Sequence, residues 1–270
     1  MARRVQRLDA ELVRRGLARS REHAVELIAA DRVEVRGVLA RKAATGVATE
    51  TPVRVLPDSA DPGYASRGGH KLRGALTTFA QIEVAGRRCL DAGASTGGFT
   101  DVLLRAGAAQ VIAVDVGYGQ LAWSVRGDPR VQTLDRTNVR SLRPDQIGGP
   151  VDLVVADLSF ISLRTVLAAL SECAKPDADM LPMVKPQFEV GRERLGSGGV
   201  VRDPQLRADA VLAVSRAAGE LGWQTCGVSR SPLPGPSGNV EFFLWLRREG
   251  QPVIDEATIT EIVTTPAEAT

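Results

Sequence analysis

The chain has 270 residues, of which 44% are apolar and 24% are charged, and its formal net charge is +2. This composition is that of an ordinary globular protein and excludes collagen-like, wholly disordered and coiled-coil chains. No apolar stretch approaches the roughly 18 to 20 residues that cross a bilayer, and no signal peptide is recognisable, so we expect a cytoplasmic protein without a membrane partner.

Residues 1–56 carry a positive charge that the rest of the chain does not share. They contain 12 Lys/Arg against 7 Asp/Glu, a net of +5, whereas residues 57–270 contain 22 against 25, a net of −3. Such a concentration of arginine attracts phosphate, although a solvated helix face would show the same run of charges. The arginines that we expect to contact RNA are Arg3, Arg4, Arg7, Arg19 and Arg21, with Arg67 beyond this segment.

Two short helices followed by strands are predicted within residues 1–56. Apolar residues recur at helical spacing between Leu8 and Gly16, and Ser20 can cap a second helix. Residues 33–35 and 53–55 alternate as strands. This small α+β segment resembles the ribosomal-protein-S-four-type RNA-binding domain, in which two helices and a hairpin present arginines to structured RNA.

After a linker at residues 57–65, which is rich in helix and strand breakers, short apolar strands alternate with helical stretches over residues 66–248. The predicted strands cover residues 88–91, 111–115, 131–135, 151–157 and 180–185. This alternation predicts an α/β fold with a mostly parallel sheet covered on both faces. Several strands end on a carboxylate, and the carboxyl ends of such strands line the ligand crevice.

Residues 249–270 contain five acidic and no basic residues. They include few large apolar side chains, which is typical of a frayed terminus. We therefore expect an acidic C-terminal tail with room for one helix around Ile259 and Ile262.

The glycine-rich run Gly93–Gly98 follows the first predicted strand of this segment and opens a helix, so its backbone can approach a ligand. It lacks the Gly-Lys-Ser/Thr ending of a phosphate loop, and Ser95 replaces the second glycine of the dinucleotide fingerprint. It also matches the nucleophile elbow of serine hydrolases. In that fold the catalytic histidine follows the serine, however, whereas His23 and His70 both precede Ser95. The loop therefore favours a cofactor that carries a nucleoside but no pyrophosphate. The alternative is a Rossmann domain that binds a nicotinamide dinucleotide.

Carboxylates beside this loop favour S-adenosylmethionine. Asp115 ends the next strand, 24 residues after Asp91, where it can accept hydrogen bonds from both ribose hydroxyls. The sulfonium cation of S-adenosylmethionine also favours acidic surroundings. We expect the cofactor to be bound by Asp91, Gly93, Ser95, Thr96, Gly97, Phe99, Asp115, Asp135 and Asp157. Three separated cysteines and two histidines give no recognised zinc or disulfide pattern, so we expect no metal.

Five motifs together resemble the TlyA family. They are Asp91–Thr100, Ala113–Leu121, Ala156–Phe160, Val184–Glu189 and Gly235–Glu241. That family, sometimes labelled haemolysins, joins the arginine-rich module to an FtsJ-like class I methyltransferase domain that has a Rossmann-like fold. The resemblance implies methylation of the cytidine ribose 2′-hydroxyl in ribosomal RNA, and the long N-terminus and C-terminal extension imply that both 16S and 23S RNA are substrates. Where relatives carry an aromatic residue and Val before Ser-Arg-Gly, this chain has Tyr64-Ala65.

The resemblance assigns Lys71, Asp157, Lys185 and Glu241 as a catalytic tetrad. A weakly acidic ribose hydroxyl must attack the methyl group in line, which requires proximity, a proton acceptor and fixed charges. A lysine desolvated beside another cation can lose its proton. We expect Lys185 to be the base, with Lys71 favouring its neutral form and stabilising the alkoxide, while the two carboxylates orient the ammonium groups and the ribose. The alternative is two ordinary ion pairs at the surface.

Two other functions stay open on the sequence alone. A noncatalytic ribosome-binding protein would bind RNA but not S-adenosylmethionine. A membrane-lytic protein conflicts with the lack of a spanning segment or a basic amphipathic helix. We favour a monomeric enzyme that acts on ribosomal RNA within ribosomal subunits.

Two further features are less decided. Residues 232–238 form either a stiff loop or a lid over the substrate. Trp123, Trp223 and Trp245 lie in apolar contexts, so we expect all three in the core.

Overall fold

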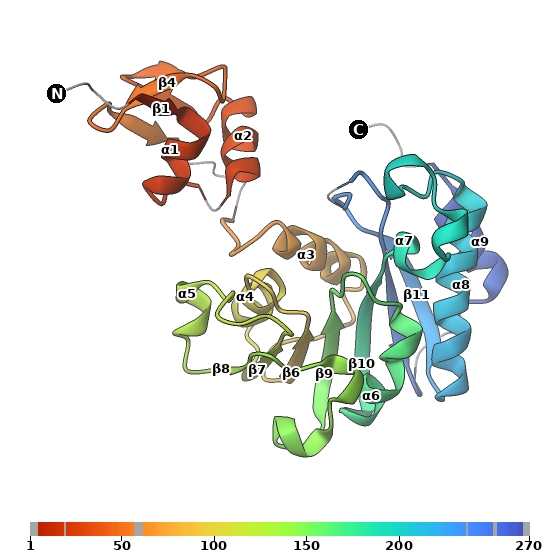
Figure 1. Ribbon diagram of the computed structural model, residues 1–270. Coiled ribbons are helices and arrows are strands. Elements are labelled where there is room, and N and C mark those ends of the chain that lie inside the picture. Colours follow the sequence, from red (N-terminus) through yellow and green to blue (C-terminus); the bar gives the residue numbers. More distant parts are fainter. Residues whose placement is uncertain (1–4, 19, 57–61, 236, 251–252, 267–270) are drawn as a thin grey trace. The chain divides into compact units, whose positions relative to one another are not determined.

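The computed structural model describes residues 5–18, 20–56, 62–235, 237–250 and 253–266 (Figure 1). The chain forms two compact units, Met1–Gly63 and Tyr64–Thr270. The boundary between the units falls within the predicted linker, of which residues 57–61 lie outside the described part.

The first unit combines two helices with short antiparallel strands. Its elements are β1 (Val5–Arg7), α1 (Leu8–Arg14), α2 (Arg21–Ala29), β2 (Val33–Val35), β3 (Val38–Leu39), β4 (Gly46–Ala48) and β5 (Val53–Val55). Strand β1 pairs with β4, and β2 lies between β3 and β5. Ser20 caps α2 because its Oγ accepts a hydrogen bond from the backbone N–H of His23 at 3.1 Å. The predicted helices and the strands β2 and β5 are confirmed.

The second unit is built on a seven-stranded sheet of order β11-β12-β10-β9-β6-β7-β8. Its strands are β6 (Arg88–Ala92), β7 (Gln110–Val114), β8 (Val131–Leu134), β9 (Val151–Ala156), β10 (Ala174–Val184), β11 (Gln224–Arg230) and β12 (Phe242–Arg247). The strands from β10 to β8 pair in parallel, and β12 is antiparallel to both β10 and β11. The predicted mostly parallel α/β sheet is confirmed.

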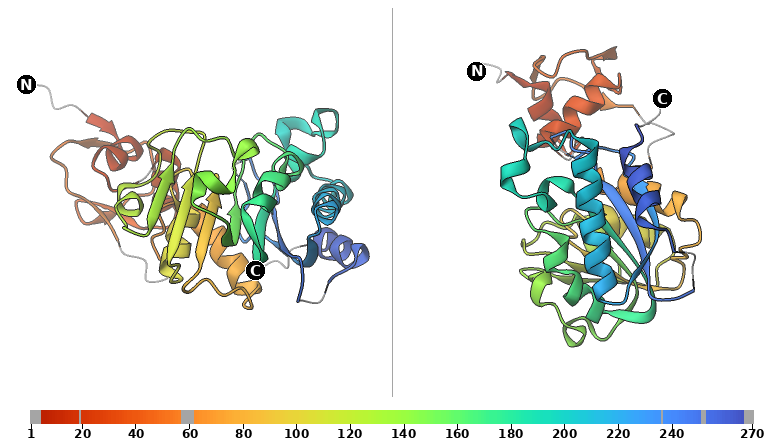
Figure 2. Two further views of the ribbon diagram at one scale, coloured as in Figure 1. Left: turned by 90° about the horizontal axis from the view of Figure 1, so that it is seen from below. Right: turned by 90° about the vertical axis from the view of Figure 1, so that its right-hand side faces the viewer.

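Helices cover both faces of this sheet (Figure 2). They are α3 (Gly68–Thr78), α4 (Gly98–Arg105), α5 (Trp123–Arg126), α6 (Leu167–Glu172), α7 (Pro186–Glu189), α8 (Pro204–Glu220) and α9 (Glu256–Thr264). Short 3-10 helices are η1 (Val139–Ser141), η2 (Pro144–Ile147), η3 (Leu163–Thr165), η4 (Arg192–Arg194) and η5 (Ser197–Gly199). Helix α8 begins at Pro204 because Asp203 accepts the backbone N–H of Gln205 at 2.9 Å and proline is tolerated in a first helical turn.

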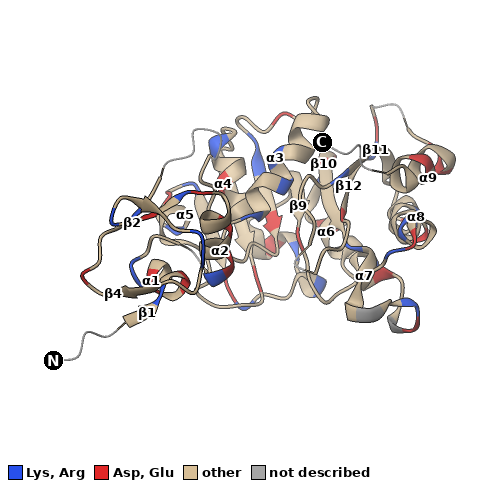
Figure 3. Ribbon diagram, turned by 90° about the horizontal axis from the view of Figure 1, so that it is seen from above, with Lys and Arg blue, Asp and Glu red and all other residues tan. Residues whose placement is uncertain are grey.

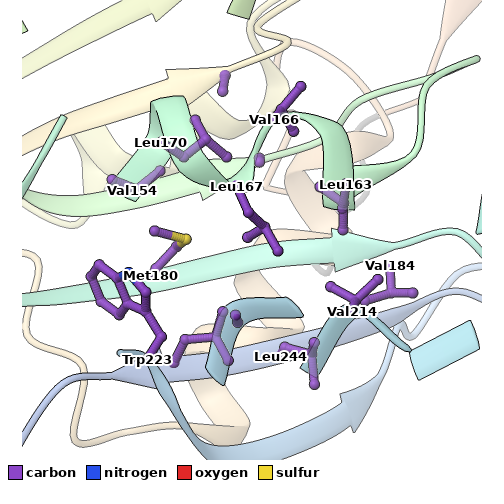
Figure 4. Close-up of a cluster of buried hydrophobic side chains, with 14 of the residues drawn as sticks. Val154, Leu163, Val166, Leu167, Leu170, Met180, Val184, Val214, Trp223 and Leu244 are labelled. Atoms are coloured by element: carbon purple, nitrogen blue, oxygen red, sulfur yellow. The ribbon is translucent and has the colours of Figure 1, made fainter. Parts of the chain in front are cut away.

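Alternating strand residues feed two separate cores. In β9, Leu153 and Val155 pack with residues of α3 and α4. Val154 points to the opposite face, where α6, α8 and α9 contribute (Figure 4). This two-sided burial follows from the period of two in a strand and explains why the sequence of β9 is apolar throughout.

The acidic C-terminal segment holds the one helix expected around Ile259 and Ile262, and this helix, α9, is packed against the sheet domain and is not frayed. Ile259 and Val263, one helical turn apart, are buried in the core shared with α8. Arg216 of α8 also forms an ion pair with Glu256 at 2.6 Å. Two apolar residues on one helical face are therefore sufficient to fix this short helix.

The prediction of three core tryptophans is correct for two. Trp223 and Trp245 are buried, and their Nε1 atoms donate to Ser171 Oγ and Asp179 Oδ1 at 2.9 and 2.8 Å. Trp123 is 85% exposed. It begins the four-residue helix α5, whose single inward position is taken by Val125.

The order of the strands determines where a ligand site can form. β6 lies between β9 and β7 in the sheet. The chain therefore adds β7 and β8 on one side of β6 and then crosses over to add β9 and β10 on its other side. The last residues of β6 and β9, Ala92 and Ala156, are direct partners in the sheet. The loops that follow the two strands therefore emerge side by side, at the position where open α/β sheets bind ligands.

Candidate active site

The loop after β6 is shaped by glycines that allow a close backbone approach. Gly93 has φ +88°, and a Cβ there would lie 2.4 Å from the carbonyl oxygen of Asp157. Gly97 has φ +93°, and a Cβ there would lie 2.9 Å from the side chain of Leu121. Any larger residue would displace the loop from the end of β9.

A first cavity of about 300 Å³ opens on this loop. It is lined by Ser66, Arg67, Gly68, Lys71, Gly93, Ala94, Ser95, Thr96, Gly98, Phe99, Asp157, Ser159, Lys185 and Pro234. The lining contains Gly93, Ser95, Thr96, Phe99 and Asp157 from the predicted cofactor residues. Its size is at the lower end of the range for small-molecule sites.

Asp115 contacts this loop and Asp135 directly follows β8, and neither is among the described residues that line the first cavity. Asp115 accepts backbone N–H groups of Ser95 and Gly117 at 2.8 and 2.7 Å, one on each oxygen. Asp135 accepts the backbone N–H of Gly119 at 3.2 Å. Since a carboxylate has about four acceptor positions, both side chains keep capacity for hydroxyl groups.

Asp91 lies beneath the loop and is fully buried. Thr100 Oγ1 donates to its Oδ2 at 2.6 Å, and Oδ1 has no hydrogen-bond partner among the described residues. Burial raises the pKa of Asp91 to about 7. We therefore expect Asp91 to support the loop from below, and not to touch a ligand in the cavity.

Two buried lysine–carboxylate pairs join four separate elements. Lys71 Nζ on α3 lies 2.5 Å from Glu241 Oε2, just before β12. Lys185 Nζ, directly after β10, lies 2.6 Å from Asp157 Oδ1, directly after β9. Each pair is formally neutral, which lowers the cost of burying its charges. The alternative of two ordinary surface ion pairs is wrong, because Lys71, Lys185 and Glu241 are all buried.

A second cavity, of about 620 Å³, lies beside the first. It is lined by Ser159, Phe160, Ile161, Ser162, Lys185, Gln187, Phe188, Gly191, Leu195, Gly198, Gly199, Ser237, Asn239 and Glu241. Ser159 and Lys185 line both cavities. A group held in one cavity can therefore meet a group held in the other at these two side chains.

Two aromatic rings border the second cavity. The rings of Phe160 and Phe188 have centroids 5.3 Å apart. Phe160 is 91% exposed and has φ +63°, a conformation that is costly for a bulky residue. Such a wall suits a planar ligand. Sequence reasoning did not assign Ser159, Phe160 or Phe188 to the site, although all three lie within the motifs quoted above.

Buried polar side chains tie the walls of the second cavity together. Glu189 on α7 accepts hydrogen bonds from Ser162 Oγ and the backbone N–H of Leu163 at 2.6 and 2.7 Å, and burial raises its pKa. Asn239 accepts the N–H of Val201 at 2.9 Å. These contacts fix loops that come from distant parts of the sequence.

The loop at residues 232–238 borders both cavities. Pro234 lines the first and Ser237 the second, while Pro236 lies outside the described residues. Gly235 donates its backbone N–H to the carbonyl oxygen of Asn239 at 2.8 Å, which closes the loop on itself. Its position beside both cavities favours the lid over the merely stiff loop.

Tyr64 and Ala65 contact the helices beside the first cavity. Ala65 donates its backbone N–H to Asp101 on α4 at 2.9 Å. The ring of Tyr64 lies edge-on to His70 of α3 and beneath the guanidinium of Arg105 of α4. An aromatic residue at position 64 therefore anchors the start of the second unit.

In the first unit, acidic and basic positions lie together along α1 (Figure 3). Two buried carboxylates of this helix, Asp9 and Glu11, hold arginine side chains. Asp9 forms ion pairs with Arg7 and Arg21, both at 3.0 Å, and these hydrogen bonds hold its pKa well below the usual range. Glu11 forms ion pairs with Arg14 and Arg15 at 2.6 and 2.7 Å, and its pKa is lowered to about 2 by the same kind of contact. The carboxylates thus fix the guanidinium groups to the helix.

These arginines differ in their accessibility. Arg7 and Arg21 keep 52% and 59% of their side chains exposed, whereas Arg15 is 18% exposed. Arg15 also donates to the backbone carbonyl groups of Ala48, Thr49 and Thr51, so its role is structural. Of the other predicted RNA contacts, Arg67 lines the first cavity, and Arg3, Arg4 and Arg19 lie outside the described residues.

No group of three or more His, Cys, Asp or Glu side chains in the described residues is arranged to hold a metal ion. No described helix is long and apolar enough to cross a membrane.

The chain is similar to several known proteins. The family model of FtsJ-like methyltransferases matches residues 64–248. The 16S/23S rRNA (cytidine-2′-O)-methyltransferase TlyA of Mycobacterium tuberculosis is 67% identical over 249 residues, which cover 92% of each chain. YqxC of Bacillus subtilis is 42% identical over 93% of this chain and 89% of its own. A solved structure of a hemolysin-named protein from Streptococcus thermophilus is 36% identical, with a TM-score of 0.76 over 97% of this chain and 95% of its own.

Proposed function

Because the chain belongs to the TlyA family of FtsJ-like methyltransferases, we propose that it transfers a methyl group from S-adenosylmethionine to the ribose 2′-hydroxyl of cytidine in ribosomal RNA. The observation that carries this proposal is the placement of the two lysine–carboxylate pairs where the two cavities meet. We propose 16S and 23S RNA as the substrates, the two RNAs in the name of the Mycobacterium tuberculosis relative, and we further propose that they are modified within ribosomal subunits.

The residues of the first cavity fit S-adenosylmethionine. The loop at Gly93 offers backbone without side chains at its tightest point, and Asp115 keeps acceptor capacity for ribose hydroxyls beside it. Asp157 supplies a negative charge suited to a sulfonium cation. When bound, the cofactor supplies an electrophilic methyl group. We assign Gly93, Ser95, Thr96, Phe99 and Asp115 to hold it, with Gly97 and Asp91 shaping the loop and Asp135 at its edge.

The second cavity fits the nucleotide that accepts the methyl group. Phe160 and Phe188 offer aromatic surface to a base, since stacking on such rings is how unpaired bases are bound. Lys185 lines both cavities, so a 2′-hydroxyl placed beside it can pass its proton to Nζ of the neutral amine. The ammonium group of Lys71 stabilises the negative charge that develops on that oxygen. Asp157 and Glu241 keep the two nitrogens in place.

The first unit supplies affinity for RNA. Arg7 and Arg21 are half-exposed, and each is held in place by Asp9, so each presents a fixed positive charge that a phosphate can contact. The second unit carries both cavities within one chain, and we propose a monomer that acts in the cytoplasm, where its ribosomal RNA substrate is found.

Methylation of purified ribosomal subunits tests this function. Small and large subunits from a strain that lacks the gene are incubated with the protein and methyl-labelled S-adenosylmethionine. The RNA is then digested to nucleosides and separated. We expect label in 2′-O-methylcytidine from both subunits. Label in a base-methylated nucleoside, or RNA binding without transfer, would contradict the proposal, and the second outcome would support a noncatalytic ribosome-binding protein.

A further inference from the structure

Ser159 occupies a position that the tetrad of ionisable residues does not explain. It lines both cavities, as Lys185 does. Its Oγ accepts a hydrogen bond from Lys185 Nζ at 3.0 Å. The residue lies two positions after Asp157, so the loop that leaves β9 brings both a carboxylate and a hydroxyl to the same lysine.

The two contacts of Lys185 differ in kind. Asp157 Oδ1 is 2.6 Å from Nζ, but among the described residues it receives no hydrogen bond of acceptable angle. Asp157 supplies the negative charge that holds the ammonium group in place. The hydrogen bond to Ser159 has a direction, because it requires an N–H of the ammonium group to point at Oγ. Ser159 thus gives the ammonium group a second contact, on a different side from Asp157.

The direction of this group decides whether Lys185 can act in the reaction. A lysine nitrogen carries three tetrahedral N–H positions on a flexible stem. One N–H of Lys185 points at Ser159 Oγ and another lies beside Asp157. The third N–H direction is left for a substrate group between the two cavities. In the neutral amine the same direction is available to the lone pair. A proton acceptor must meet this geometric requirement before its basicity matters.

We propose that Ser159 is a positioning residue for methyl transfer, which holds Lys185 Nζ so that its free direction meets the ribose 2′-oxygen. The inference rests on the proposed function of the site. The hydroxyl of Ser159 accepts from the lysine, so its own proton points away from Nζ and can be donated to the substrate. No covalent change at Ser159 is involved.

The surroundings of Ser159 allow this role to be separated from folding. The side chain is exposed, so replacing it removes no core packing. The next residue, Phe160, has φ +63°, which turns the chain sharply after Ser159. If the contact between Ser159 and Lys185 were incidental, its removal would leave the reaction unchanged. If it aims Lys185, a displacement of about 1 Å can lower the rate roughly 100-fold.

Kinetics of Ser159→Ala and Ser159→Thr test the inference in the full-length protein. Ser124→Ala is the matched control, because Ser124 is an exposed serine on α5 that lines neither cavity. We expect Ser159→Ala to lower kcat on ribosomal subunits roughly 10- to 100-fold, with the KM for subunits and the affinity for S-adenosylmethionine within about twofold of wild type. Ser159→Thr restores the hydroxyl, so its kcat returns to within about threefold. Unchanged kcat in Ser159→Ala would overturn the inference, and so would lost cofactor affinity, which would make Ser159 a cofactor contact.

Nuclear magnetic resonance of the lysine side chains gives a readout that does not depend on turnover. In protein labelled with ¹⁵N at lysine Nζ, the Lys185 signal is identified by its absence in Lys185→Arg. We expect slow exchange with water in wild type and in Ser159→Thr, and fast exchange in Ser159→Ala. Exchange that is equal in all three proteins would overturn the inference. A wild-type protein that transfers no methyl group would contradict the proposed function, while the exchange measurement still decides whether Ser159 holds Lys185.

Discussion

The ammonium group of Lys71 lies 2.5 Å from the carboxylate of Glu241, although 170 residues separate them in the chain. Lys71 belongs to α3, which packs on one face of the sheet, and Glu241 directly precedes β12 within it. The second pair, Lys185 and Asp157, comes from the ends of two neighbouring strands. The four candidate catalytic residues thus come together only in the folded domain. Of the two lysines, Lys71 lines the first cavity, whereas Lys185 lines both.

Removal of Lys185 tests its assignment to the chemical step. We expect Lys185→Ala to abolish methyl transfer and to leave the affinity for S-adenosylmethionine within about tenfold, because the loop at Gly93 carries most of the binding. Lys175→Ala is the matched control, since Lys175 forms a similar pair with Asp152 at 2.6 Å away from both cavities. Calorimetric titration measures the affinity. Retained turnover would disprove the base assignment, and lost cofactor binding would make Lys185 a cofactor residue.

Asp115 should show the opposite pattern. Its carboxylate holds the backbone of Ser95 and Gly117 and is assigned to the ribose of the cofactor. We expect Asp115→Ala to weaken S-adenosylmethionine binding at least tenfold and to keep most of the turnover at saturating cofactor, since each hydrogen bond to a charged group contributes about 1.5 to 3 kcal/mol. Asp128→Ala, which removes an exposed carboxylate paired with Arg130, is the control. Unaltered affinity in Asp115→Ala would place the ribose elsewhere.

Burial of Asp91 predicts a pH dependence of stability. The folded pKa of about 7 lies above the ordinary value of 3.8, so between these values the folded state binds more protons than the unfolded state. The Asp91 carboxyl therefore contributes most to the free energy of unfolding below pH 4, and this contribution is lost as the pH rises towards 7. Relative to Asp91→Asn, wild type should lose up to about 1.4 kcal/mol of unfolding free energy for each pH unit in this window. Urea unfolding of both proteins at pH 5, 6, 7 and 8 measures the difference, and parallel profiles would show that Asp91 is not perturbed.

The exposed arginines of the first unit should determine how RNA affinity depends on salt. We expect Arg7→Ala and Arg21→Ala each to weaken binding to ribosomal subunits and to reduce the slope of log affinity against log salt by about 1. Each single variant leaves Asp9 with one arginine partner, which limits the loss of stability. Arg143→Ala is the control, because Arg143 is an exposed arginine of the second unit that is paired with Asp145.

Unchanged affinity and salt slope in Arg7→Ala and Arg21→Ala would show that RNA is bound elsewhere. Arg67, which lines the first cavity, would then be the next residue to test. In all these variants cofactor binding should stay unchanged, since the described residues that line the two cavities belong to the second unit.

Much of the sheet could be predicted because buried parallel strands have a simple sequence pattern. The apolar runs that end near Asp91, Asp115, Asp135 and Asp157 became β6, β7, β8 and β9, with bounds that differ by about one residue. The short strands β1, β3 and β4 were not predicted. β3 has only two residues, and β1 and β4 each contain a single β-branched residue, whereas β2 and β5 alternate Val with a charged residue. Trp123 was misplaced because its apolar neighbours in the sequence do not show that α5 lies at the surface.

The parts of the site that directly follow a strand could be predicted from the sequence. The parts that depend on how side chains pack could not. The loop at Gly93 could be found from its position after a strand, whereas the burial of Asp91 beneath that loop depends on α4 and Thr100. The second cavity was missed because its walls come from three separated stretches, residues 159–162, 185–199 and 237–241. In the first unit, the 18% exposure of Arg15 against the 52% exposure of Arg7 depends on the packing of Arg15 against Ala48–Thr51, which a count of charges does not contain.

Mapping of ribose methylation across ribosomal RNA tests most directly whether the paired lysines catalyse 2′-O-methyl transfer. The comparison uses cells that lack the gene and the same cells supplied with the wild-type protein, Lys185→Ala or Lys175→Ala at equal expression. We expect 2′-O-methylcytidine in 16S and 23S RNA with the wild type and with Lys175→Ala, and none at those positions with Lys185→Ala. Methylation that persists with Lys185→Ala, or that does not depend on the gene, would contradict this expectation.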